Sequence, residues 1–179
     1  MVDPVTARIW SYRALFVVLV GLLALLRLMP VGGAPGGLPG PDLIVALTLA
    51  WVLRRPAYVP AWLIVALFLP LDLLLGHPPG LGALSVLLGA EALRARQALT
   101  RSLPFLLEWA LVAAVLLAMT GAVQVVLALF AAPRPILGLD LLRALFTALA
   151  YPAIVLVTQA LFGVRKASPG EVDALGARL

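Results

Sequence analysis

The sequence has no cysteine, a single histidine and few charged residues. The lack of cysteine excludes disulfides and thiol chemistry. The histidine, His77, lies in a Pro/Gly turn and cannot form a zinc site, which needs three or four protein ligands. Only 12% of the 179 residues are charged, while 64% are hydrophobic. Soluble domains are roughly half apolar and a quarter charged, so we expect one membrane domain over residues 1–179.

Common catalytic motifs are also missing. The sequence contains neither the GxxxxGK[ST] phosphate loop nor GxGxxG. Ser85 and Ser102 have no histidine base placed to activate them. We therefore expect no catalytic residues, no cofactor and no bound metal. An intramembrane enzyme that uses only Asp or Glu remains an alternative.

Long apolar runs rich in Leu and Ala predict membrane helices, since the runs do not alternate as barrel strands do. Breaks rich in Pro, Gly or Arg separate the predicted spans, which are residues 12–29, 42–54, 57–75, 80–95, 103–131 and 139–163. Twelve helical residues cover ~18 Å of a ~30 Å bilayer core, so the second and fourth spans are short. A re-entrant pair, with four or five crossings, is the alternative. The first run could also be a signal peptide, but the later runs favour a first span.

The loop charges predict the orientation. The amino tail, the second and fourth connections and the carboxyl tail share ten basic residues: Arg8, Arg13, Arg54, Arg55, Arg94, Arg96, Arg101, Arg165, Lys166 and Arg178. The opposite side has Arg134 alone. The positive-inside rule places the ten, and both termini, in the cytoplasm. This alternation requires all six segments to cross, and it explains the formal charge of +5 without nucleic acid.

Charged residues within the spans require an explanation, because each costs ~2.5–3.5 kcal/mol at the bilayer centre. Five of them are predicted to gather near the outer face: Arg27, Asp42, Asp72, Asp140 and Arg143. Asp140 and Arg143 are three residues apart and can pair on one helix. The cluster is interpreted either as interfacial pairing that fixes helix depth or as a polar site for a ligand or partner helix. A second group is predicted toward the cytoplasm: Glu91, Arg94, Arg96 and Glu108.

The fifth span carries small residues at four-residue spacing: Ala110, Ala114, Ala118 and Ala122. Small residues let helix backbones approach closely in lipid. The stripe predicts either packing within this chain or a docking face for the helix of another protein.

Residues 39–96 contain a membrane aspartate, a Gly/Pro turn and a Gly-Leu pair at which the next span begins. The pattern consists of Asp72, Leu73, Leu74, Gly76, Pro78, Gly80 and Leu81, preceded by Pro41-Asp42 and Arg54-Arg55-Pro56. In these residues the chain resembles the MreD family of bacterial rod shape-determining membrane proteins, in its alphaproteobacterial form. The remaining sequence agrees in hydropathy and total length more than in motif.

The resemblance implies a non-enzymatic component of the cell-elongation and peptidoglycan-synthesis machinery of the bacterial inner membrane. The implied partners are a membrane-anchored MreC-like protein, the actin-like MreB, the glycosyltransferase RodA and a class B penicillin-binding protein. The implied fold is an all-α bundle of about six helices that resembles the substrate-binding subunits of energy-coupling-factor vitamin transporters. That kinship supplies the alternative function, a small-molecule uptake subunit. The absence of an AxxxA motif from residues 14–28 disfavours it.

Overall fold

The computed structural model describes residues 4–29, 38–97 and 104–164. This part of the chain is all helical, as expected, and contains no strand. Its elements are α1 (Pro4–Leu28), α2 (Leu43–Arg54), the 3-10 turn η1 (Pro56–Tyr58), α3 (Ala61–Leu74), α4 (Leu81–Ala95), α6 (Phe105–Leu129) and α7 (Leu137–Phe162). Four basic residues of the charge count and one serine lie outside the described residues, namely Arg101, Ser102, Arg165, Lys166 and Arg178.

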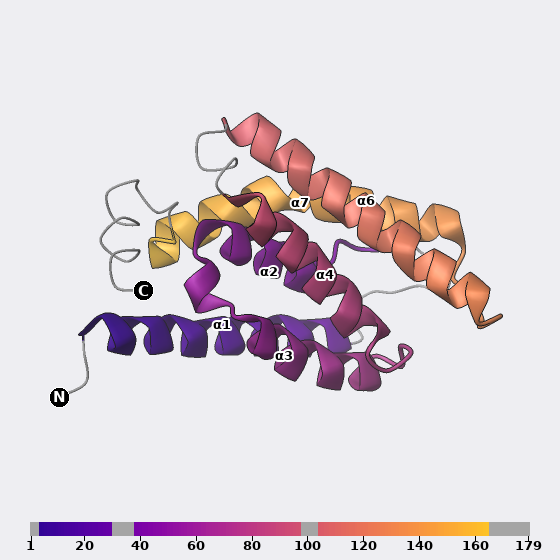
Figure 1. The fold of residues 1–179 in the computed structure, drawn as a ribbon, viewed down its shortest axis with the longest axis horizontal. Helices are drawn as coiled ribbons and strands as arrows, with labels where there is room; N and C mark the ends of the chain where they lie inside the picture. Colours follow the sequence, from indigo (N-terminus) through magenta and orange to yellow (C-terminus); the bar gives the residue numbers. More distant parts are fainter. Residues whose placement is uncertain (1–3, 30–37, 98–103, 165–179) are drawn as a thin grey trace.

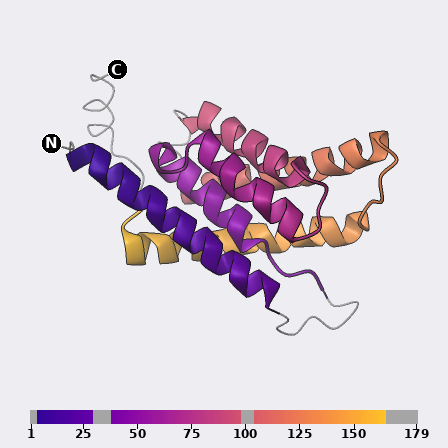
Figure 2. The ribbon, with the colours of Figure 1, turned by 90° about the horizontal axis from the view of Figure 1, so that it is seen from below.

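Successive helices run in opposite directions along the bundle (Figure 1). The start of α1 and the end of α7 lie at one end, and the α3–α4 and α6–α7 turns lie at the other (Figures 1 and 2). Helices α1, α6 and α7 are long and apolar enough to cross a bilayer. Helices α2, α3 and α4 have 12, 14 and 15 residues, which cover only ~18–23 Å. The chain is therefore a helical membrane bundle, and the count of six crossings remains a prediction.

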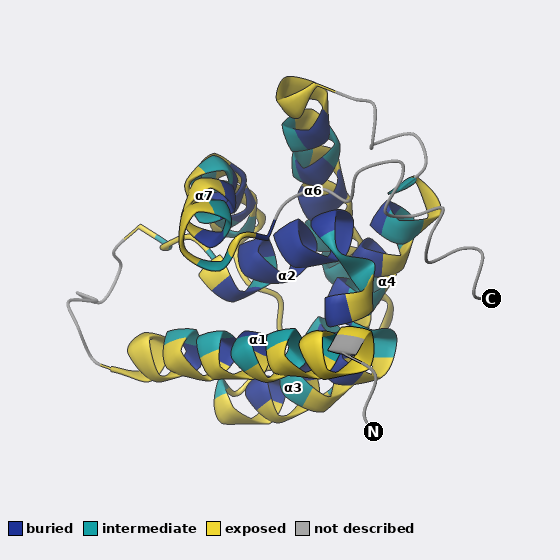
Figure 3. Cartoon of the chain, turned by 90° about the vertical axis from the view of Figure 1, so that its left-hand side faces the viewer, coloured by how far each residue is buried: buried dark blue, intermediate teal, exposed yellow. Residues whose placement is uncertain are grey.

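Helix α2 forms the centre of the bundle. Ten of its twelve residues are buried, and it packs against α4 and α7, with α1 on a further side (Figure 3). Its Trp51 is fully buried, and the ring lies 5.4 Å from that of Phe16. A helix surrounded by protein does not have to match the thickness of the lipid, which accounts for the short α2.

Two predicted boundaries are wrong. Helix α1 begins at Pro4 instead of residue 12, because proline is well suited to the first turn of a helix, and the polar residues before the apolar run continue the same helix. The predicted helix over 57–75 begins only at Ala61. Pro60 disfavours a helical conformation at Val59, which adopts φ −125° and ψ 72°, so the chain forms η1 first.

Candidate functional site

All five residues of the predicted outer cluster line one cavity. The cavity has a volume of about 500 Å³, which is within the ~300–1,000 Å³ typical of small-molecule sites. It is lined by residues of all six α-helices of the described chain, at the end of the bundle that holds the α3–α4 and α6–α7 turns. The five residues are Arg27, Asp42, Asp72, Asp140 and Arg143.

The remaining lining combines two polar turn residues with an apolar wall. His77 and Arg134 contribute from the α3–α4 and α6–α7 turns. The wall includes Phe68, Leu71, Val86, Leu116, Met119 and Leu127. The cavity is therefore amphipathic, with charged and apolar groups in one lining.

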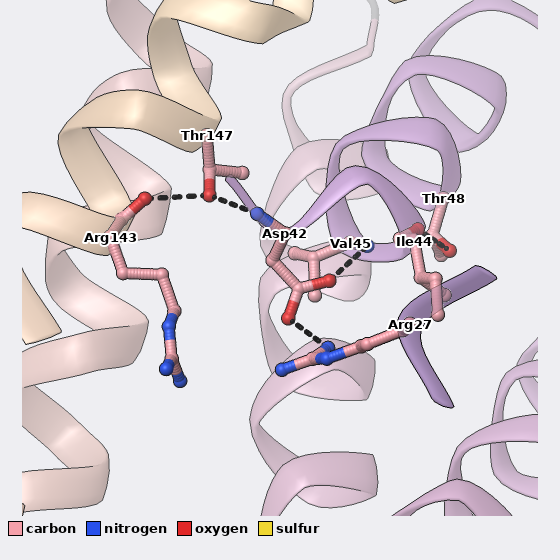
Figure 4. A network of polar contacts seen from close by, with 7 residues as sticks. All are labelled: Arg27, Asp42, Ile44, Val45, Thr48, Arg143 and Thr147. Carbon is pink, nitrogen blue, oxygen red and sulfur yellow. Dashed lines mark hydrogen bonds and ion pairs between the residues drawn. The ribbon is translucent and has the colours of Figure 1, made fainter. Parts of the chain in front are cut away.

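Asp42 joins three helices at the cavity. Its Oδ1 accepts a hydrogen bond from the backbone N–H of Val45 at 3.2 Å, so it caps α2, and its Oδ2 accepts one from Arg27 of α1 at 2.8 Å (Figure 4). The backbone N–H of Asp42 donates to the hydroxyl of Thr147 at 2.8 Å. That hydroxyl donates in turn to the carbonyl of Arg143 at 2.7 Å. The start of α2 is thus attached to α1 and α7.

Asp72 is buried, with 4% of its surface exposed. Its Oδ2 accepts hydrogen bonds from the backbone N–H groups of Gly80, at 3.1 Å, and Ala83, at 3.0 Å. A carboxylate at a helix N-terminus satisfies amides that have no partner within the helix. Gly80 has φ +84°, a conformation that favours glycine. Asp72 therefore caps α4 from the preceding helix.

The expected ion pair between Asp140 and Arg143 does not form within the described residues. Oδ2 of Asp140 instead accepts a hydrogen bond from the side-chain amide of Gln124 on α6 at 2.6 Å. The side chain of Arg143 extends from α7 toward the space beside Asp42 and Arg27 (Figure 4). In the part of the chain that the structure describes, its guanidinium makes neither a hydrogen bond nor an ion pair.

A second polar network lies buried in the other half of the bundle. The Arg54 guanidinium lies 3.2 Å from Oε1 of Glu108, and the Tyr151 hydroxyl donates to the same oxygen at 2.8 Å. Glu108 and Tyr151 are fully buried and Arg54 is 6% exposed. The network connects α2, α6 and α7. The sequence placed Glu108 in the cytoplasmic group but did not identify Arg54 as its partner.

The rest of that cytoplasmic group is closer to the surface. Glu91 pairs with Arg94 one turn further along α4, and Arg94 also donates to the carbonyl of Val59. Arg96 is exposed at the end of α4. These residues surround the turn after α2 and do not join the buried network.

The four alanines of the stripe, Ala110, Ala114, Ala118 and Ala122, are all exposed on α6. The buried side of α6 carries Val112, Val115 and Leu116 instead. The interpretation of the stripe as packing within this chain is therefore wrong for these positions. The stripe faces away from the other helices.

No group of three or more histidine, aspartate or glutamate side chains could hold a metal ion within residues 4–29, 38–97 and 104–164. Comparisons with protein-family models, with curated proteins and with solved structures give no match. Function is therefore inferred from the cavity, the buried networks and the exposed helix faces.

Proposed function

We propose that this protein is a non-enzymatic component of the cell-elongation machinery in the bacterial inner membrane, and that it acts by binding an MreC-like membrane-anchored protein. MreB, RodA and a class B penicillin-binding protein are the further members of that proposed assembly. The observation that carries the proposal is the turn at Asp72. The central residues of the family resemblance belong to one local structure: Asp72 caps α4, and both Gly76 and Gly80 adopt positive φ. A motif whose members act together is more specific than the same residues scattered through an apolar sequence.

The environment of the carboxylates supports a structural role. Asp42 and Asp72 each cap a helix, Asp140 binds Gln124, and Glu108 binds both Arg54 and Tyr151. A general acid or base must be free to exchange a proton with a substrate. Because these carboxylates are held in hydrogen bonds within the bundle, they suit a structural role in this chain better than a catalytic one.

The exposed alanine stripe on α6 supplies the proposed partner face. The stripe extends over more than three helical turns, and each of its four positions carries only a methyl group. The positions are Ala110, Ala114, Ala118 and Ala122. In lipid, close backbone approach provides the packing contacts that hold two helices together. We place the single membrane helix of the MreC-like partner along this stripe.

Co-purification tests the proposal. The full chain and an MreC-like protein from the same genome would be co-expressed and extracted in mild detergent, with a tag on this chain. We expect a stable complex, and we expect the double substitution Ala114→Leu/Ala118→Leu to reduce recovery of the partner by about tenfold or more, because leucine holds the backbones apart.

Ala14→Leu is the matched control, since Ala14 is an exposed alanine on α1. It should leave recovery of the partner unchanged. Absence of any complex with the wild-type chain would contradict the proposed function. Equal loss in the control and in the α6 variant would contradict the assigned face.

The cavity specifically favours a second candidate, the substrate-binding subunit of a small-molecule uptake transporter. Its volume of about 500 Å³ is adequate for a vitamin-sized ligand. Equilibrium binding of a panel of vitamins to the purified chain tests this candidate. Tight binding of one of them would replace the first proposal, and uniform lack of binding would remove the second.

A further inference from the structure

We propose that the cavity binds the phosphate group of an amphiphilic molecule, with Arg143 as the main ligand to the phosphate. This inference does not depend on the proposed partner. It rests on which hydrogen-bonding groups around the cavity already have partners, on the apolar wall and on the position of the cavity in the bundle.

Each carboxylate of the cavity is engaged with the protein itself through at least one oxygen. Both carboxylate oxygens of Asp42 accept hydrogen bonds, from Val45 and from Arg27. Asp72 accepts two backbone N–H groups and is almost fully buried. Asp140 accepts the amide of Gln124. One oxygen of Asp72 and one of Asp140 accept no hydrogen bond from the described residues.

The neutral hydroxyl donors are engaged as well. Ser85 donates to the carbonyl of Gly82 at 2.8 Å, and Thr120 donates to that of Leu116 at 3.0 Å. Thr147 donates to the carbonyl of Arg143. The hydroxyl protons along the wall are thus committed to backbone carbonyls.

Two cationic donors face the cavity. Arg143 projects toward the cavity, and its guanidinium has no partner within the described residues. Arg27 directs one nitrogen to Asp42 and has further N–H groups on the same planar fork. The connection 30–37, between Arg27 and Asp42, has no acidic residue in its sequence. An arginine at membrane depth is costly without a counter-charge, so the unpartnered guanidinium of Arg143 points to an anionic ligand.

Phosphate suits this arrangement better than a small halide does. The guanidinium presents donors in a rigid fork that matches two oxygens of one phosphate. Arg27 and Arg143 approach the same space from α1 and α7 (Figure 4), so they can contact different oxygens of one group.

The apolar wall indicates that the phosphate belongs to an amphiphile. Phe68, Leu116 and Met119 line the same cavity as the two arginines. Leu28 and Leu43, next to Arg27 and Asp42 in sequence, are exposed. A phospholipid headgroup would enter the cavity, and its acyl chains would continue over these exposed leucines. The predicted orientation places this end of the bundle at the outer interface, where such headgroups lie.

Thermal unfolding of the full chain in a neutral detergent tests the proposal. The midpoint would be measured against increasing dihexanoyl phosphatidylglycerol, glycerol 3-phosphate, inorganic phosphate and an uncharged short-chain diacylglycerol. We expect saturable stabilisation by the phospholipid. Arg143→Gln should raise the half-saturating concentration by about tenfold or more, and Arg143→Lys, which keeps the charge but loses the fork, should raise it less.

Arg96→Gln is the matched control, because Arg96 is an exposed arginine remote from the cavity. It should respond to the phospholipid as the wild type does. Equal response of Arg143→Gln, or equal stabilisation by the uncharged diacylglycerol, would overturn the proposal. If glycerol 3-phosphate acts as strongly as the lipid, the phosphate site stands and its source is a soluble ester.

Native mass spectrometry provides a reading that does not require a variant to fold. The wild-type chain would be extracted from membranes and washed extensively in neutral detergent. A retained adduct of phospholipid mass that inorganic phosphate or glycerol 3-phosphate displaces supports the site. A chain that carries only detergent, and that takes up no added phosphatidylglycerol, overturns it.

Discussion

A Cβ atom on Gly82 would stand 2.1 Å from Oδ1 of Asp72. The carboxylate cannot move aside without cost, because its other oxygen is held by the N–H groups of Gly80 and Ala83. Gly82→Ala should therefore displace the carboxylate and break the cap of α4. Hydrogen bonds to charged groups contribute ~1.5–3 kcal/mol each, so we expect a loss of stability on the order of 2–4 kcal/mol. The thermal midpoint in detergent measures it.

Gly121→Ala is the control for this prediction. Gly121 lies within α6, and a Cβ there would meet nothing within 4 Å. Alanine is the better helix former by ~1 kcal/mol, so the change should be neutral or slightly stabilising. Similar losses at residues 82 and 121 would mean that the contact with Asp72 is not the cause.

Substitution of Asp72 itself tests the loss of the carboxylate without the steric clash that Gly82→Ala introduces. Asp72→Ala removes both accepted hydrogen bonds from the start of α4 and should cost about 2–4 kcal/mol. Asp72→Asn keeps one carbonyl oxygen and should cost less. Unfolding midpoints and the amount of inserted protein measure the order. A larger loss in the asparagine variant, or loss of a measurable turnover, would contradict a purely structural role.

The buried network at Glu108 should behave as one unit. Glu108→Leu or Arg54→Met alone leaves a buried charge without its partner, and each should cost ~3–5 kcal/mol. The double variant should lose much less than the sum. Tyr151→Phe removes one hydrogen bond and should cost ~1 kcal/mol.

Glu91→Gln provides a comparison at the surface. Glu91 is exposed and pairs with Arg94 on the same helix, so its removal should cost at most ~1 kcal/mol. Additive losses for the Arg54 and Glu108 variants in a double-mutant cycle would show that the two side chains are not coupled.

The absence of cysteine makes a test of the fourth helix simple, because any introduced thiol is unique. His77 and Arg96 are exposed and flank the two ends of α4. If α4 crosses, His77→Cys should react with a membrane-impermeant maleimide in intact spheroplasts, and Arg96→Cys only after permeabilisation. Labelling of both positions from outside would show that α4 is re-entrant.

Much of the helix layout could be predicted from the sequence, because prolines and arginines separate the apolar runs. The outer cluster was also predictable as a group. Arg27, Asp42 and Asp72 each lie near a span end at the same predicted depth, and alternating crossings bring such ends together. The depth of a residue in the bilayer follows from its distance in sequence from the end of its span, and this distance can be counted directly.

The partners within each group were not predictable, because they depend on how each helix is rotated about its axis. Leu, Val and Ala surround α6 on every side, so hydropathy does not indicate which face is buried. For this reason the sequence did not join Glu108 to Arg54 or Asp140 to Gln124. It also left the direction of the alanine stripe open.

The central position of α2 has a consequence for how the chain is made. The second helix to leave the ribosome is too short to span a bilayer on its own, and ten of its twelve residues are covered in the finished protein by helices that include α4 and α7. Its first residues reach their final bonds only when Thr147 has been synthesised. Until then the start of α2 lacks its attachment to α7. A chain that ends before α7 would therefore leave part of its own centre uncovered.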